Sequence, residues 1–97
     1  MAVFRSRLRH EGSAEFQELA DRMLETARSM PGFLSYKVYF SEDGERCSII
    51  EFDSHEHLRG WREHPDHLTA QRLGRERYYQ EYSLHVAEPE RESLFTR

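Results

Sequence analysis

An Asp-Gly pair at residues 43–44 constrains the fold of this chain more than any other feature. It separates two runs that are rich in aromatic and β-branched residues, "FLSYKVYF" (33–40) and "RCSIIEFD" (46–53). Asp-Gly suits the central positions of a tight turn whose twist matches that of the flanking strands. The segment therefore predicts two antiparallel strands joined by a hairpin turn.

Hydrophobic periodicity predicts a strand and a helix before this hairpin. Residues 2–9 alternate with period two, which indicates a strand. After Gly12, Ser13 is a good N-cap for a helix that carries one apolar stripe. Pro31 ends that helix, because proline disfavours helical geometry in the residue before it.

A second helical region and a last strand are predicted after the hairpin. Ser54 is expected to cap a short helix through Trp61. His64 and Pro65 then restart the helix, which is expected to run to about Tyr79. Residues 82–88, "YSLHVAE", alternate again and predict the last strand.

The predicted order β-α-β-β-α-β indicates an α+β fold of the ferredoxin-like type, a four-stranded antiparallel sheet with helices on one face. Six residues are expected on the uncovered face: Arg5, Arg7, Lys37, Tyr39, Glu51 and His85. A mixed polar and aromatic face of this kind favours a homodimer formed sheet to sheet, in which Arg5 or Arg7 would pair with Glu51. The alternative is a monomer whose polar face is solvated.

Length and composition limit the number of domains, the possible partners and the expected cellular location. The chain has 97 residues and a net charge of −4, which fits one domain (1–90) with a polar tail (91–97) and gives no case for nucleic acid or an anionic membrane. No apolar run approaches the ~20 residues that span a bilayer. The single cysteine excludes an internal disulfide and suits a reducing compartment, so we expect a cytoplasmic protein.

Three local patterns resemble the antibiotic biosynthesis monooxygenase (ABM) family of dimeric α/β-barrel proteins. They are Pro-Gly-Phe at 31–33, the Asp-Ser start of the second helix at 53–54, and the string Trp-x-x-His-Pro-x-His at 61–67. The resemblance covers roughly residues 2–88. It implies a homodimer with a ligand cleft between the helices and the sheet of each subunit.

The resemblance also implies two chemistries. Cofactor-free members oxidise activated phenols to quinones with molecular oxygen, so the protein binds the substrate, aids its deprotonation and stabilises charge. Another branch binds and degrades haem through a tryptophan, an iron-ligating histidine and a first-strand asparagine. Trp61 matches the tryptophan of both branches. The haem branch's histidine position holds Gln71 and its asparagine position holds about Ser6, which argues against haem.

In the quinone-forming branch an asparagine precedes the tryptophan by one turn and a tyrosine follows it by six residues. These positions hold His57 and His67 here, and both side chains can transfer protons. The resemblance therefore implies Trp61, His67 and His57 as candidate catalytic residues. The candidate substrate-binding residues are Ser6, His64, Gln71 and Tyr78.

The histidines between residues 55 and 67 raise two further readings. His64 and His67 are three residues apart and could face one way, with Asp66 nearby, but nothing in the spacing demands a metal. The plainer interpretation is that His64 caps a helix and His55 is solvated. Trp61 can be core, cleft wall or both, and Tyr78 can belong to a helix–sheet seam.

Together these patterns predict a cofactor-independent monooxygenase that acts on a small aromatic phenol or quinol, with no metal. The alternative is a non-catalytic dimeric protein that binds a small molecule or serves as an accessory protein on the same fold. Haem degradation is the third reading.

Overall fold

The structure is a computed structural model that describes residues 1–9 and 13–97, apart from the Ser13 side chain, so the predicted N-cap lies outside the described residues. Its elements follow in chain order: β1 (Ala2–Leu8), α1 (Ser13–Ser29), β2 (Phe33–Phe40), β3 (Arg46–Phe52), α2 (His55–Arg62), α3 (Pro65–Leu73), the π-helix η1 (Gly74–Tyr78) and β4 (Tyr79–Val86).

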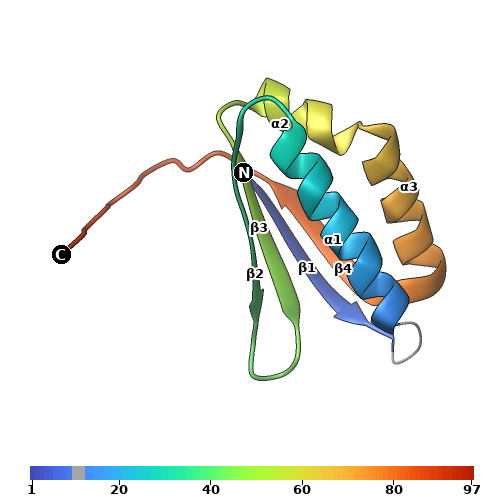
Figure 1. Cartoon of the computed structure of the whole chain (residues 1–97). Helices are drawn as coiled ribbons and strands as arrows, with labels where there is room; N and C mark the ends of the chain where they lie inside the picture. Colours follow the sequence, from blue (N-terminus) through green and yellow to red (C-terminus); the bar gives the residue numbers. More distant parts are fainter. Residues whose placement is uncertain (10–12) are drawn as a thin grey trace.

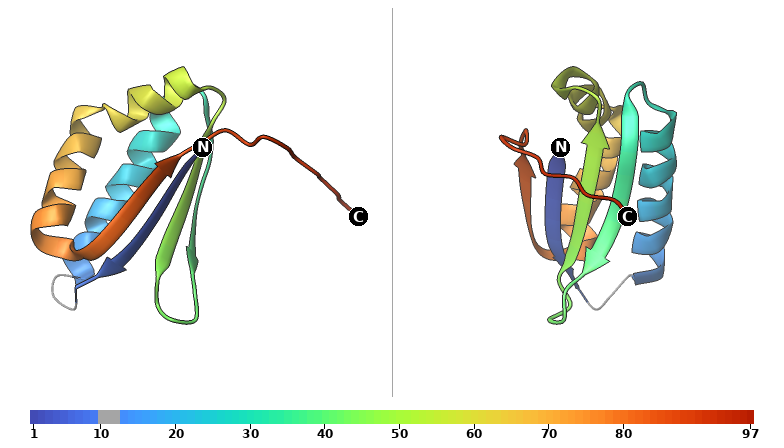
Figure 2. Two further views of the ribbon diagram at one scale, coloured as in Figure 1. Left: turned by 180° about the vertical axis from the view of Figure 1, so that it is seen from behind. Right: turned by 90° about the vertical axis from the view of Figure 1, so that its left-hand side faces the viewer.

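The four strands form one antiparallel sheet in the order β2-β3-β1-β4. Figure 1 and Figure 2 show that the helices lie together on one face of this sheet, with α1 and α3 side by side across it. The other face carries no element among the described residues. The predicted α+β class with a ferredoxin-like antiparallel sheet is confirmed.

The β2–β3 hairpin forms where the Asp-Gly pair predicts it. The backbone N–H of Gly44 donates to the Ser41 carbonyl at 3.0 Å, and that of Ser41 donates to the Glu45 carbonyl at 2.9 Å. Gly44 has φ of 90°, a left-handed conformation that glycine adopts without a Cβ clash. The turn therefore depends on glycine at this position.

Both predicted caps of the second helical region are present. The Ser54 hydroxyl accepts a hydrogen bond from the backbone N–H of His57 at 3.1 Å and starts α2. His64 Nδ1 accepts from the backbone N–H of Asp66 at 3.1 Å and starts α3, with Pro65 at its first position. The His64 side chain is thereby held at the start of this helix.

The end of this region differs from the sequence prediction. The α-helix ends at Leu73, the turn Gly74–Tyr78 is a π-helix, and β4 already begins at Tyr79. Tyr79 pairs with Leu8 of β1, so strand pairing outweighs the helical pattern here. A Cβ on Gly74 would overlap the Tyr79 ring, and glycine therefore lets the ring pack against this turn.

Strand alternation gives the two faces of the sheet different side chains. Ala2, Phe4 and Ser6 of β1 point toward the helices, whereas Arg5 and Arg7 lie on the open face. The register places Lys37, Tyr39, Glu51 and His85 on the open face too, as predicted. We call the two sides the covered face and the open face.

Two apolar clusters fill the space between the covered face and the helices. One is built from Ala2, Ala27, Ile50, Phe52, Leu58 and Trp61. The other is built from Phe16, Leu19, Met23, Ala70 and Tyr78. Beyond Val86 the chain has no helix or strand and extends away from the domain, with Leu94 and Phe95 exposed (Figure 1). Among the described residues, no helix is long and apolar enough to cross a membrane.

Candidate active site

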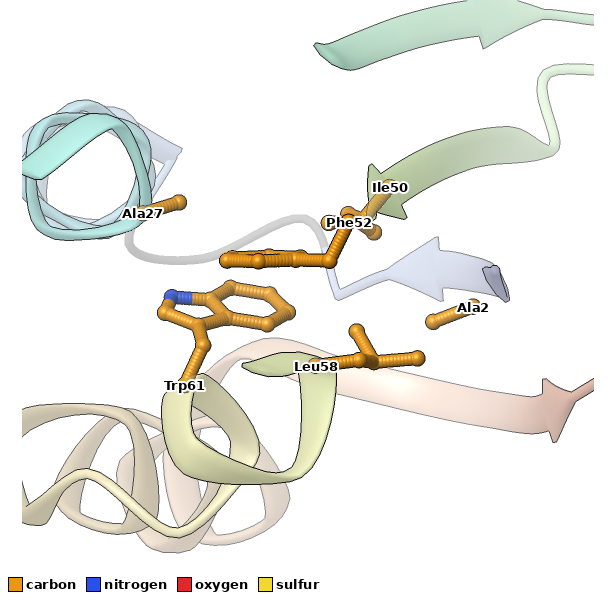
Figure 3. Close-up of a cluster of buried hydrophobic side chains, with 6 residues drawn as sticks. All are labelled: Ala2, Ala27, Ile50, Phe52, Leu58 and Trp61. Atoms are coloured by element: carbon orange, nitrogen blue, oxygen red, sulfur yellow. The ribbon is translucent and has the colours of Figure 1, made fainter. Parts of the chain in front are cut away.

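Trp61 forms a wall between α2 and the sheet. Leu58 and Trp61 lie one turn apart on α2, so both face inward, and Trp61 is only 3% exposed. Its indole stacks on Phe52 with ring centroids 5.9 Å apart, and Tyr36 meets it edge-on at 6.0 Å. Figure 3 shows the Phe52 ring lying over the indole, whose nitrogen is on the side of α1.

His67 packs directly against Trp61 from the first turn of α3. The two ring centroids are 4.3 Å apart. His67 Nδ1 lies 3.1 Å from the backbone carbonyl oxygen of Arg62, and a carbonyl can only accept, so Nδ1 carries the proton. Nε2 of the neutral ring is then the free acceptor. Burial lowers the pKa of His67 below its ordinary value, which keeps the ring neutral at pH 7.

A cavity of about 70 Å³ lies between the helices and the covered face, beside Trp61 and His67. A volume of this size exceeds that of one water molecule several times. Its apolar lining comes from both sheet and helices: Ala2, Phe4, Phe16, Leu19, Ala20, Met23, Ile50, Trp61, Ala70 and Leu84. Its polar lining comprises Tyr36, Arg46, Arg62, His67, Gln71, Tyr79 and Tyr82.

The charged lining of this cavity is cationic. Two arginines reach it, and no aspartate or glutamate lines it within residues 1–9 and 13–97. Arg46 is 9% exposed, donates to the Ser48 hydroxyl at 3.1 Å, and lies 5.2 Å from the centre of the Phe16 ring. The cavity is therefore complementary to a ligand with negative charge.

Two tyrosines supply neutral hydroxyls to the same space. Burial raises the pKa of Tyr79 to about 12, and burial also raises the pKa of Tyr36, against the opposing charge of Arg46. Both phenols thus stay protonated at physiological pH and can donate hydrogen bonds. The indole N–H of Trp61 is a further donor, and it has no hydrogen-bond partner among the described residues.

The structure brings together three of the seven residues that the sequence singled out: Trp61, His67 and Gln71 all line the cavity. His57 does not. It lies outside, because its Nδ1 is 2.6 Å from Asp53 Oδ1 and its side chain is 43% exposed. His64 is also absent from the lining, since its ring caps α3.

Ser6 and Tyr78 are buried but are not lining residues. Ser6 lies on the covered face next to Arg46 in the strand register, and its hydroxyl has no partner in the described part of the chain. The Tyr78 hydroxyl donates to Glu15 Oε2 at 3.3 Å, and its ring packs on Phe16. Tyr78 is thus part of the seam between α1 and η1.

Sequence reasoning missed the residues that give the cavity its polar character: Tyr36, Arg46, Arg62, Tyr79 and Tyr82. Arg46 had a readable signal. It starts a strand whose alternate members Ser48 and Ile50 are inward residues, so an arginine at that position had to point inward as well. The described residues contain no group of three or more metal-ligating side chains.

Together, these observations define a small α+β domain with a cavity between its helices and its sheet. The family model for "Antibiotic biosynthesis monooxygenase" (ABM) matches residues 1–73, and the chain belongs to this family.

Relatives and solved structures agree with this assignment. The chain is 33% identical to the uncharacterized protein YqjZ of Bacillus subtilis (strain 168) over 94 residues, which cover 97% of this chain and 82% of that protein. Rv0793 from Mycobacterium tuberculosis has a similar structure, with a TM-score of 0.81, 24% identity and 96% of each chain covered. SnoaB from Streptomyces nogalater, a cofactor-independent oxygenase, gives a TM-score of 0.70 at 22% identity and 91% coverage of both chains.

Proposed function

We propose that this protein is a cofactor-independent monooxygenase that oxidises a small aromatic phenol or quinol with molecular oxygen. The observation that carries the proposal is the pair of Trp61 and His67. A neutral, buried imidazole lies against an aromatic wall inside a cavity that no acidic side chain lines within the described residues. The family assignment and the likeness to SnoaB support the same reaction class.

His67 would act as the general base. Its Nδ1–H is held by the Arg62 carbonyl, so Nε2 is the atom that accepts the phenolic proton. The tyrosine hydroxyls and the arginines then stabilise the phenolate, because charge in a site of low dielectric interacts strongly with fixed donors and cations. The protein deprotonates the substrate and holds it for oxygen.

The oxidation balances without an added reductant. The deprotonated substrate, whose activated carbon carries hydrogen, gives electrons to oxygen. A carbon–oxygen bond forms at that carbon, and a hydroperoxide results. Loss of water breaks the oxygen–oxygen bond and leaves a carbonyl at that carbon. One oxygen atom enters the quinone, the other leaves as water, and the substrate supplies both hydrogens of that water.

The direct test is oxygen uptake with a panel of hydroquinones and anthrones, with and without chelator. Wild type is expected to consume oxygen with at least one member of the panel, and chelator is expected to leave the rate unchanged. His67→Gln should lower the rate by roughly 10²–10⁴-fold, the usual contribution of a general base. His55→Gln is the matched control, because His55 pairs with Glu88 outside the cavity. No uptake across the panel would contradict the proposal.

One observation favours the second candidate, a non-catalytic binding protein. His57, at the position where the oxygenase branch has its asparagine, is engaged by Asp53 outside the cavity and supplies no group to a bound substrate. Ligand binding without oxygen uptake would support this candidate. Haem titration tests the third hypothesis, which requires a Soret shift that His64→Gln or His67→Gln abolishes.

We also propose that the protein works as a homodimer through the open face. That face is mixed in character, with Val3 and Ile49 paired on it and only partly exposed. Within the chain, Arg5 pairs with Glu45, and Glu51 accepts a hydrogen bond from Ser35 at 3.3 Å. Sedimentation equilibrium is expected to give twice the chain mass, and an Ile49→Glu substitution is expected to give the single-chain mass.

A further inference from the structure

A polar row crosses the covered face at its hairpin end. Arg46 of β3 is in register with Ser6 of β1, which is in register with Tyr82 of β4. Arg46 and Tyr82 line the cavity, and Ser6 lies between them, 1% exposed. The neighbouring row, Ser48, Phe4 and Leu84, is mostly apolar. This end of the cavity is therefore chemically distinct from the aromatic end at Trp61.

Arg46 is buried without a counter-charge from the described residues. Its neighbours are the Ser48 hydroxyl, the Phe16 ring and the Tyr36 phenol, none of which carries a charge. A buried cation is unfavourable unless an anion or several hydrogen bonds compensate it. Arg46 offers five N–H donors, and one of them is used in this contact with Ser48. Arg46 lines the cavity, so a bound ligand could reach the donors that Ser48 and Tyr36 do not use.

A second observation points the same way. The Ser6 hydroxyl, directly opposite Arg46, lacks a hydrogen-bond partner among the residues that the structure describes. Buried hydroxyls in folded proteins nearly always have a partner. The Ser6 hydroxyl is thus an unsatisfied polar group beside Arg46, although Ser6 itself does not line the cavity.

The lining of the cavity extends along β3. Arg46 and Ile50 both line it, and four residues of strand separate them by roughly 13 Å, since a strand rises about 3.3 Å per residue. Ile50 belongs to the cluster that contains Trp61. A single ligand that extends along the strand can therefore place a ring at Trp61 and an ionised group at Arg46.

We propose that the ligand of this cavity is an aromatic carboxylate, whose ring packs at Trp61 and whose carboxylate pairs with Arg46. The inference rests on the proposed function in one respect only, namely that the aromatic ring is the group that is oxidised. A guanidinium binds a carboxylate through two parallel hydrogen bonds, and charge-assisted bonds of this type are the strong ones. The polar row then sets which aromatic compounds enter the cavity.

The test is calorimetric binding of two probes of nearly equal shape, 2-naphthoate and the neutral 2-naphthamide, at neutral pH. Wild type is expected to bind the carboxylate on the order of ten- to a hundredfold more tightly, the range of hydrogen bonds to charged groups. Arg46→Met should remove this preference and leave the amide affinity nearly unchanged. Arg5→Met, on the open face, should retain the preference.

Equal affinity of wild type for the two probes, or no binding of the carboxylate, would overturn the proposal, and this comparison needs no variant. A preference that survives in Arg46→Met would overturn it too. If Arg46→Met does not fold, Arg46→Lys takes its place and is expected to keep the preference at reduced strength. Binding is measured without turnover, so carboxylate selectivity without oxygen uptake would reject the oxygenase and retain this inference. Oxygen uptake without a preference for the carboxylate would support the oxygenase and reject this inference.

Discussion

The arginines on the two sides of the sheet differ in whether they form ion pairs. On the open face, Arg5 Nε lies 2.9 Å from Glu45 Oε1, and Arg7 pairs with both Asp43 and Glu81. On the covered side, Arg46 of β3 and Arg62 of α2 reach the cavity, and neither has an ion pair with a described residue. The carboxylates of this acidic chain are thus at the surface, where water already solvates the arginines.

This difference suggests two roles for the arginines: those on the open face keep the surface soluble, and those at the cavity recognise a ligand. Exposed ion pairs contribute little to stability, because water and salt screen them and two long side chains must be ordered. A cation in a cavity contributes little to stability for another reason, since its desolvation offsets its contacts. Its effect appears when a ligand binds. The following predictions test this contrast, from the largest expected effect to the smallest.

Truncating the covered-face aromatic wall should have the largest effect on folding. Trp61→Ala is expected to lower the free energy of unfolding by ~3–5 kcal/mol, the usual range for a buried aromatic side chain. Tyr39→Ala is the open-face counterpart. Tyr39 is 51% exposed within one chain, so we expect a smaller loss, limited to what the proposed dimer interface buries. Urea unfolding measures both. Similar losses in the two variants would mean that the faces do not differ in burial.

Removing the buried cation should leave folding nearly intact. Arg46→Met keeps most of the side-chain volume and removes a charge without a described counter-ion, so the free energy of unfolding should fall by less than about 1 kcal/mol, or rise. Urea unfolding of the ligand-free protein checks this. A loss above about 2 kcal/mol would show that Arg46 stabilises the fold and is not reserved for a ligand.

Acid should destabilise the covered face through His67. Burial lowers its folded-state pKa below the ordinary value of about 6.5, so the unfolded state binds more protons below pH 6.5. Stability is therefore fully present above about pH 6.5 and is lost as the pH falls from there toward the folded-state pKa. Thermal unfolding from pH 7.5 to 5 should show a smaller pH dependence in His67→Gln than in wild type. His55→Gln should behave like wild type.

The smallest effect on stability is expected from removing the exposed ion pairs of the open face at high salt. Arg7→Met removes the exposed pairs with Asp43 and Glu81, and we expect no measurable shift of the urea midpoint in 0.5 M salt, roughly three times physiological ionic strength. The Arg7 pair also holds the pKa of Asp43 below its usual range, after the larger effect of the Ser41 hydroxyl. NMR titration of Asp43 should therefore give a higher pKa in the variant.

Much of the fold follows from local signals. The Asp-Gly turn, the caps Ser54 and His64, and the period-two strands predict elements that the structure contains, because each signal depends on neighbours in sequence. The exception is Tyr79, where pairing with Leu8 ends the helix early. Such pairing depends on a residue far away in the chain and leaves no local pattern.

The site could be predicted only in part. Trp61 and His67 follow from the family pattern, and helical spacing places both toward the sheet. The inward direction of Arg46 depends on strand register, in which a shift of one residue reverses every side chain. The same pattern predicts His57 in the cleft, but Asp53, directly after β3, holds its ring outside. A contact of that kind is set by the turn between strand and helix.

The glycine of the π-turn links two positions that a sequence comparison would treat as separate. The Tyr79 ring occupies the space that a Cβ at residue 74 would need. The residue types at positions 74 and 79 therefore constrain each other. A relative with alanine or a larger residue at position 74 must have a smaller side chain at position 79. Tyr79 lines the cavity, so a smaller side chain at position 79 would widen it. The residue types at positions 74 and 79 of each relative would then indicate how large a ligand its cavity accepts.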